Sequence, residues 1–163
     1  MSRLAKTEVS QVIGAPAEAV YRAFVDPQML ATWLPPGSMT GIVHAFDPRE
    51  GGAFSMSLVY PTDDHPMRGK TSDSTDTFRG RFAKLVPNQR IVWAVEFESA
   101  DPSFAGEMTV TASLAPADGG TRITMLCENI PAGISPADNE AGSRASLEKL
   151  AALLERQLKS YLK

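Results

Sequence analysis

The hydrophobic pattern of the last stretch of the chain predicts one long helix over residues 136–162. Ser135 is a favourable N-cap, Pro136 suits the first helical position, and Asp138 lies where an acidic side chain reaches back to the cap. A helix of this length spans about 40 Å, so it must cross most of a domain of this size. Its apolar positions recur at helical spacing and form one stripe: Leu147, Leu150, Ala151, Leu154, Leu158, Tyr161 and Leu162.

The same stripe, extended backwards at about 100° per residue, meets Ser143, Glu140 and Pro136. The face is therefore apolar in its C-terminal half and small or polar in its N-terminal half. Two interpretations are open. The polar half roofs a cavity, with Glu140 and Ser143 as its polar groups, or these turns extend into solvent. If the roof excludes water, loss of hydration would favour the protonated carboxyl of Glu140 and suit it to proton transfer.

Upstream of this helix, short apolar runs alternate with turn residues. Residues 7–13 predict a first strand, and Ala15-Pro16 opens a short helix. Asp26-Pro27 ends that helix, because a residue before proline is pushed out of helical geometry. A second short helix is predicted over residues 27–33. Six further strands are predicted at residues 40–46, 53–60, 75–86, 90–98, 107–115 and 121–129.

The predicted strands alternate apolar and polar residues, and tight-turn sequences such as Asp118-Gly119-Gly120 join them. Consecutive half-buried strands imply an antiparallel sheet with one wet face, and the long helix is left to cover the dry face. The predicted fold class is α+β, in a single domain over residues 1–163. Helix residues Trp33 and Leu147 and an inward, methionine-rich strand wall form the predicted ligand-binding set, although the same residues could instead fill a solid core. The wall is Phe54, Met56, Trp93, Phe97, Met108 and Met125.

The order of these elements resembles the helix-grip fold of START-like lipid-transfer domains and birch-pollen-allergen-like proteins. Short motifs along nearly the whole chain are similar to those of the activator of heat-shock protein 90 ATPase homologue family, in the SRPBCC superfamily. They are Asp26-Pro27 with Leu30 and Trp33, Phe46-Asp47-x-Arg49-x-Gly51-Gly52-x-Phe54-x-Met56, Gly80-x-Phe82, Pro87-x-x-Arg90-Ile91-Val92, Gly119-Gly120-Thr121, Glu128-Asn129-x-Pro131 and residues 142–150.

The resemblance implies a curved antiparallel sheet of about seven strands wrapped around the C-terminal helix, with two short helices after the first strand. It also implies a deep cavity between sheet and helix, usually lined by apolar and aromatic side chains. Many members carry a large aromatic residue just after the helix glycine, where this chain has Ser143. Loss of that ring is expected to widen the cavity and leave a hydroxyl in it.

The composition limits the expected partners and cellular location of the protein. The chain has 163 residues, is 43% hydrophobic and carries a net charge of −3 without a basic block, so nucleic acid is not an expected partner. The first residues lack an apolar signal region and no run of about 18 apolar residues occurs, so we expect a cytoplasmic protein with no membrane partner. The single cysteine, Cys127, allows no internal disulfide. A homodimer through edge strands or loops remains open.

Several polar residues could carry chemistry, and each also has a structural interpretation. His44 could be a general base near neutral pH or simply a hydrogen-bonded strand residue. Asp63-Asp64-His65 could coordinate a metal, although such loop clusters are usually solvated. Arg49 could bind an anion or tie its turn through a salt bridge. Cys127 faces inward by strand parity, as an inert thiol would. No sequence motif indicates nucleophilic catalysis, and neither a metal nor a cofactor is expected.

Three hypotheses follow. The first is a protein that binds a small hydrophobic ligand without turnover. The second is a cyclase- or hydratase-like enzyme in which Glu140 or His44 moves a proton in the same pocket. The third is a protein-interaction module with a stress or co-chaperone role, which requires an exposed apolar patch of several hundred Å². Charged residues on the outer face of the long helix argue against such a patch there: Arg144, Glu148, Lys149, Glu155, Arg156 and Lys159.

Overall fold

The computed structural model describes residues 5–60 and 75–161, so the Asp63-Asp64-His65 cluster and Leu162 lie outside the described residues. The element ends agree with the sequence analysis to within one or two residues, and the short 3-10 helix η1 lies in a stretch predicted as loop. The elements are β1 (Ala5–Ile13), α1 (Ala17–Val25), α2 (Pro27–Trp33), β2 (Thr40–Phe46), β3 (Ala53–Val59), β4 (Thr75–Val86), β5 (Arg90–Phe97), η1 (Pro102–Phe104), β6 (Met108–Ala117), β7 (Gly120–Ile130) and α3 (Pro136–Tyr161).

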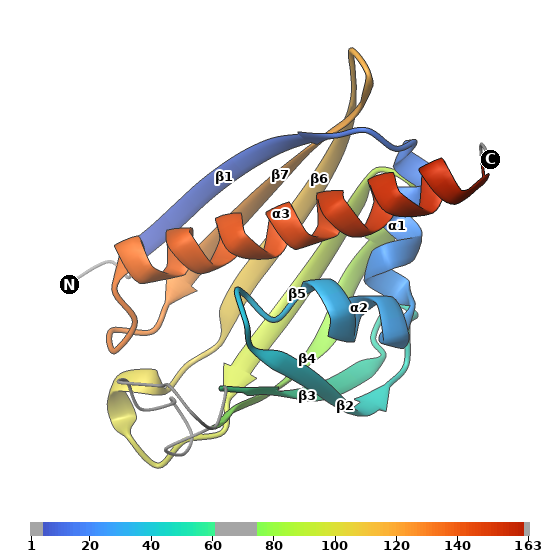
Figure 1. Cartoon of the computed structure of the whole chain (residues 1–163). Coiled ribbons are helices and arrows are strands. Elements are labelled where there is room, and N and C mark those ends of the chain that lie inside the picture. Colours follow the sequence, from blue (N-terminus) through green and yellow to red (C-terminus); the bar gives the residue numbers. More distant parts are fainter. Residues whose placement is uncertain (1–4, 61–74, 162–163) are drawn as a thin grey trace.

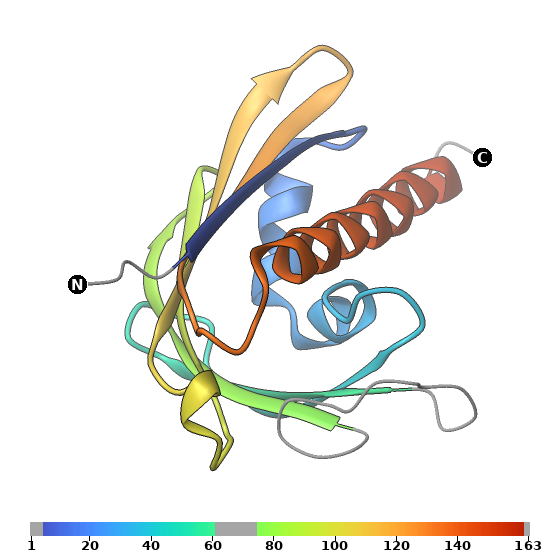
Figure 2. The ribbon, with the colours of Figure 1, turned by 90° about the vertical axis from the view of Figure 1, so that its left-hand side faces the viewer.

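All strands join one seven-stranded antiparallel sheet in the order β1-β7-β6-β5-β4-β3-β2. The sheet curves, and the three α-helices lie on its concave side (Figures 1 and 2). The backbone of α3 approaches the edge strand β1 more closely than it approaches the central strands. This arrangement is the α+β helix-grip architecture that the sequence predicts.

One aspartate shapes the bend between the two short helices. Asp26 leaves helical geometry before Pro27, as predicted, and its carboxylate then accepts hydrogen bonds from the backbone N–H groups of Gln28 and Met29 at 2.9 and 3.1 Å. At the other end of α1, Pro16 is the N-cap in extended geometry and not the first helical residue, so α1 begins one position later than predicted. The same aspartate therefore ends α1 and starts α2.

The N-terminus of α3 is also capped as predicted. The Ser135 hydroxyl accepts a hydrogen bond from the Asp138 N–H at 3.0 Å. Farther along α3, the predicted apolar stripe is buried at Leu147, Leu150, Ala151 and Leu154. The side chains of the last four α3 residues lie outside the described part, so the stripe is confirmed up to Leu154.

The turn between β2 and β3 requires glycine. Gly51 has φ +82°, and a Cβ on Gly52 would lie 2.1 Å from the Asp47 carbonyl oxygen. Gly51 N–H donates to Phe82 O and Phe82 N–H to Gly52 O, at 2.8 and 2.9 Å, so the turn is fastened to β4. Arg49 Nε lies 3.0 Å from Asp47 Oδ2 in an exposed ion pair, which favours the turn-tying role of this arginine.

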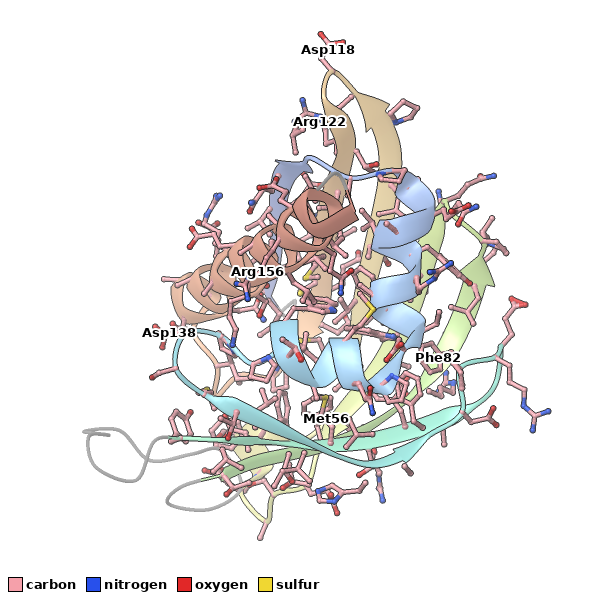
Figure 3. The ribbon with its side chains drawn as sticks, turned by 45° about the vertical axis from the view of Figure 1, so that its right-hand side comes forward. Met56, Phe82, Asp118, Arg122, Asp138 and Arg156 are labelled. Atoms are coloured by element: carbon pink, nitrogen blue, oxygen red, sulfur yellow. The ribbon has the colours of Figure 1, made fainter. Side chains whose placement is uncertain are left out.

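The concave side holds the hydrophobic core. Met56 and Phe82 point into it, whereas Asp118, Arg122, Asp138 and Arg156 lie at the surface (Figure 3). Aromatic rings from four elements meet in its centre. The Phe24 ring lies 4.7 Å from that of Trp33 and 5.5 Å from that of Trp93, which lies 5.6 Å from Phe54. The predicted inward wall is therefore packed against α1 and α2 at this end of the sheet.

Candidate functional site

A cluster of small polar side chains lies beneath the N-terminal half of α3. The Thr7 hydroxyl on β1 donates to Asn139 Oδ1 on α3 at 2.5 Å. Cys127 on β7 is 3% exposed, and Thr7, Asn139 and Ser143 are all within hydrogen-bonding reach of its thiol. Burial raises the pKa of the Cys127 thiol, and these hydrogen bonds offset part of that rise. Ser143 thus faces the sheet, as its place on the helical stripe predicts.

Exposure on the concave face rises toward one end of the sheet. Along β5, Ile91 and Trp93 are 1% and 4% exposed, whereas Phe97 is only partly buried. Along β3, Phe54 is 1% exposed and Leu58 is partly buried. One end of the interior is therefore sealed and the other is more thinly covered. Seven residues of the predicted ligand-binding set belong to the buried core cluster: Trp33, Phe54, Met56, Trp93, Met108, Met125 and Leu147. Phe97 is partly buried and packs against this cluster.

The two tryptophans of this cluster differ in one respect. The indole N–H of Trp33 donates to the carbonyl oxygen of Ala23 in the last turn of α1, at 2.9 Å. The indole nitrogen of Trp93 is fully buried and has no hydrogen-bond partner among the described residues. Buried donors without partners are rare in native proteins because each has lost its bond to water.

Glu140 does not point into the interior, which corrects the prediction from the helical stripe. Its side chain is 47% exposed, and its carboxylate lies 3.5 Å from the guanidinium of Arg144, one turn further along α3. The residue before it, Asn139, faces the sheet instead. The reason is angular: Asn139 is four residues before Ser143 and about 40° from it around the helix, whereas Glu140 is about 60° away in the other direction.

His44 is not in the interior either. It sits at a register irregularity in the edge strand β2 and is exposed. Its Nε2 lies 2.7 Å from the hydroxyl of Ser57, which in turn lies 2.8 Å from the hydroxyl of Thr77. This chain of polar groups favours the interpretation of His44 as a hydrogen-bonded strand residue. Glu140 and His44 belong to elements on opposite sides of the domain, so the structure does not bring the two proton-transfer candidates together.

Sequence analysis missed a buried carboxylate near the thinly covered end. Asp76 on β4 is 1% exposed, and the Tyr60 hydroxyl donates to its Oδ2 at 3.1 Å. Burial, then the charge of Asp76 and this hydrogen bond, raise the pKa of Tyr60 to about 12. A signal was present, because Asp76 lies two residues before the inward-facing Phe78 and so shares its face of the predicted strand.

Two side chains of α3 hold the segment that follows α2. The Ser146 hydroxyl donates to the Leu34 carbonyl oxygen at 2.5 Å. The Lys149 ammonium donates to the carbonyl oxygens of Pro35 and, at 3.2 Å, Gly37, and burial lowers its pKa. Lys149 was predicted on the outer face of α3, but it reaches across to this segment. The contacts fix the middle of α3 to α2.

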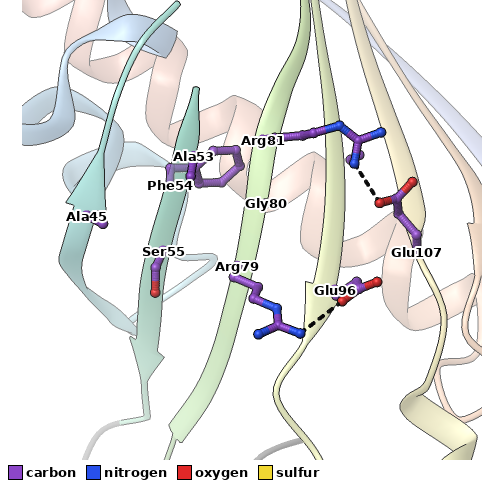
Figure 4. Close-up of a pocket in the computed structure, with 10 residues that line it drawn as sticks. Ala45, Ala53, Phe54, Ser55, Arg79, Gly80, Arg81, Glu96 and Glu107 are labelled. Atoms are coloured by element: carbon purple, nitrogen blue, oxygen red, sulfur yellow. Dashed lines mark hydrogen bonds and ion pairs between the residues drawn. The ribbon is translucent and has the colours of Figure 1, made fainter. Parts of the chain in front are cut away.

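A pocket of about 380 Å³ lies on the convex side of the sheet, away from the helices (Figure 4). Small residues form its floor, and two exposed ion pairs flank it. Arg79 lies 3.3 Å from Glu96 and Arg81 lies 2.8 Å from Glu107. Because each arginine already faces a carboxylate, the pocket offers little net charge to a ligand, and it is not the predicted cavity.

The exposed apolar residues do not form one patch. Among the described residues, the large hydrophobic side chains that are exposed are Val12 at 38% and Ile42 at 51%. They belong to β1 and β2, the opposite edges of the sheet. A co-chaperone-type surface therefore finds no support in the described part of the chain. No helix within residues 5–60 and 75–161 is long and apolar enough to cross a membrane.

The curved sheet gripping a long C-terminal helix, with a polar cluster beneath one half of that helix, defines a helix-grip domain of the START-like class. The chain belongs to the family described as Activator of Hsp90 ATPase homolog 1-like protein, whose sequence profile matches residues 14–155. The predicted family membership is thus confirmed.

Solved structures agree with this assignment. A Chromobacterium violaceum protein is similar at 36% identity and a TM-score of 0.82, over 92% of this chain and 96% of its own. A protein described as AHSA1-like from Aeromonas hydrophila shares the fold at 20% identity and a TM-score of 0.69, over 94% of each chain. A Mycobacterium smegmatis protein shares it at 18% identity and a TM-score of 0.71, over 93% of this chain and 92% of its own. A comparison with curated proteins returned no significant match.

Proposed function

We propose that this protein binds an apolar or aromatic small molecule between the central strands and the N-terminal half of α3. The observation that carries this proposal is the polar cluster of Thr7, Cys127, Asn139 and Ser143 on the concave face. A helix that only closed a core would be apolar on this face along its whole length, as α3 is from Leu147 onward.

Three further features support the proposal. Ligand sites are mostly apolar with a few placed polar groups, and the concave face has this composition. Met56, Met108 and Met125 are buried in the wall, and methionine adapts to ligands of different shape. The backbone of α3 stands closer to β1 than to the central strands β5 and β6, which α1 contacts instead (Figure 2).

The proposal is tested with an environment-sensitive apolar dye and a pair of variants. Ser143→Phe fills the space beneath α3 with a ring, and we expect it to reduce dye affinity at least tenfold. Ala141→Phe is the matched control, because Ala141 is exposed on the same helix and the same ring there would point to solvent. The control should bind the dye as the unaltered protein does.

Native mass spectrometry of protein purified gently from its own host gives an independent measurement. A reproducible extra mass that is lost on denaturation would support the proposal and give the size of the ligand. The proposal is wrong if no apolar probe binds saturably, or if Ser143→Phe and Ala141→Phe bind the dye equally well. The same spectrum reports whether the protein is a homodimer.

A further inference from the structure

We propose that the indole N–H of Trp93 is the polar anchor of this site, and that the ligand is an uncharged apolar molecule with a hydrogen-bond acceptor oxygen, such as a ketone or an ether. This inference rests on the proposed binding function and adds the chemical class of the ligand. It begins from the one buried side-chain N or O atom without a partner among the described residues, Trp93 Nε1.

The environment of Trp93 makes an unpaired donor unusual. Its side chain is 4% exposed, so bulk water does not reach the donor. Trp33, in the same aromatic cluster, has its N–H satisfied by the Ala23 carbonyl. The fold can therefore supply a partner to a buried indole in this region, yet Trp93 has none. A buried donor of this kind is suited to a bound acceptor, because binding restores the hydrogen bond that folding removed.

The sheet register places this donor in line with the polar cluster. Thr7 pairs with Cys127, Cys127 with Val110 and Val110 with Trp93, so these four residues form one row across β1, β7, β6 and β5. Neighbouring strands are about 4.8 Å apart, so the Trp93 and Cys127 backbones are roughly 10 Å apart. Val110 between them is small and apolar. A molecule lying along this row would meet polar groups at its two ends and an apolar surface between them.

The charge of the interior selects the ligand class. The fully buried polar residues in the described ranges are Thr7, Ser57, Asp76, Thr121 and Ser146. None of them is a cation, so the interior has no fully buried positive charge to balance an anionic ligand. An indole N–H is a donor only and carries no charge. An uncharged acceptor oxygen is therefore its best partner.

The competing explanation is that the Trp93 N–H rests against an aromatic face. The rings of Phe24 and Phe54 are tilted by 46° and 54° to the Trp93 ring, so such a contact is geometrically accessible. N–H···π contacts are weak, and a carbonyl or ether oxygen should replace one readily. Only if the ring contact persisted in the complex would a bound ligand gain nothing from an acceptor oxygen.

The test uses two probes of the same shape, methyl naphthyl ketone and its isopropenyl analogue, in which C=CH₂ replaces C=O. Dissociation constants for both come from displacement of the dye, in the unaltered protein and in Trp93→Phe. Removal of the N–H should lower the preference for the ketone by roughly 2- to 12-fold, the effect of one neutral hydrogen bond. Ala141→Phe, at the exposed α3 position used above, is the control and should keep the unaltered preference.

Heteronuclear NMR of the unaltered protein supplies a readout that needs no variant to fold. The chain has two tryptophans and so two indole N–H resonances. The ketone should shift the Trp93 resonance downfield and leave that of Trp33 in place. The inference is overturned if the ketone binds without this shift, or if Trp93→Phe keeps the ketone preference. Failure of both probes to displace the dye from the unaltered protein would overturn it as well, and with it binding of such molecules at the proposed site.

Discussion

The two halves of α3 face the same sheet with opposite chemistry. From Leu147 to Leu154 the inward side chains are apolar and almost fully buried. From Asn139 to Ser143 they are polar and bond to Thr7 and Cys127. The apolar stretch from Leu147 to Leu154 is what a helix needs to close a core. The polar stretch from Asn139 to Ser143 is not needed to close the core, which fits the proposal that this part of α3 faces a ligand while the apolar part anchors the helix.

The largest expected effect is at the apolar half. Leu150→Ala removes a side chain that is 0% exposed, and we expect a loss of about 2–5 kcal/mol in the free energy of unfolding, because the neighbouring core cannot collapse fully onto the gap. Urea denaturation measures it. Leu153→Ala, at a partly buried position on the same helix, is the control and should cost clearly less. A loss at Leu150 no larger than that at Leu153 would show that the fully buried stripe does not anchor α3.

The next largest effect is the difference in stability loss between the two tryptophan variants. Trp33→Phe leaves the Ala23 carbonyl without its donor, whereas Trp93→Phe removes a donor that has no protein partner. We expect Trp33→Phe to be the more destabilising by about 1–3 kcal/mol. Thermal and chemical denaturation of both variants measure this difference. A Trp93→Phe variant that loses as much stability as Trp33→Phe would mean that the Trp93 N–H does contribute to folding.

A smaller effect is expected in the polar half. Thr7→Val keeps the shape of the side chain but removes the hydroxyl that donates to Asn139, so the free energy of unfolding should fall by about 0.5–1.5 kcal/mol. Ser10→Ala, at an exposed position of the same strand, should change it much less. If Thr7→Val proves more costly than Leu150→Ala, the polar half is the structural anchor and the comparison must be reversed.

The smallest effect is confined to alkaline pH. The pKa of Tyr60 is raised from 10.0 to about 12, so the folded state keeps this proton at pH values where the unfolded state loses it. The stability that this provides is complete below the unfolded pKa and is lost as pH rises through the folded value. Tyr60→Phe should remove this part of the alkaline loss, and tyrosinate absorbance should show one fewer late-titrating group. An unchanged absorbance titration would contradict the assignment.

The fold could be predicted from the sequence because the residue patterns that determine its elements are local. Alternation in the strands, Asp26-Pro27 and the Ser135 cap each depend on neighbours along the chain, and each is found as predicted. The inward position of Ser143 was accessible for the same reason, since helical periodicity fixes it relative to Leu147. Element ends differ by a residue or two, as at Pro16, because caps and last turns are decided by single hydrogen bonds.

The candidate site was harder to predict because its polar side chains have partners that are distant in the sequence. The helical stripe placed Glu140 inward, although it lies about 60° around the helix from Ser143, and its half-exposed carboxylate lies 3.5 Å from Arg144 instead. Helical periodicity could have placed Asn139 on the inward face. Its partner Thr7 is 132 residues away in the sequence, and only tertiary packing brings the two together. The missing partner of Trp93 is likewise visible only once every neighbouring group is placed.

The pairing of β1 with β7 has a consequence for how the chain is made. The first strand emerges from the ribosome early, yet its sheet neighbour is the last strand to be synthesised. At common translation rates of about 5–20 residues per second, β1 waits for several seconds or more without its only strand partner. The concave face remains uncovered even longer, until α3 follows. This fold can therefore be completed only after β7 and α3 have been synthesised, and the nascent domain is most exposed to aggregation until then.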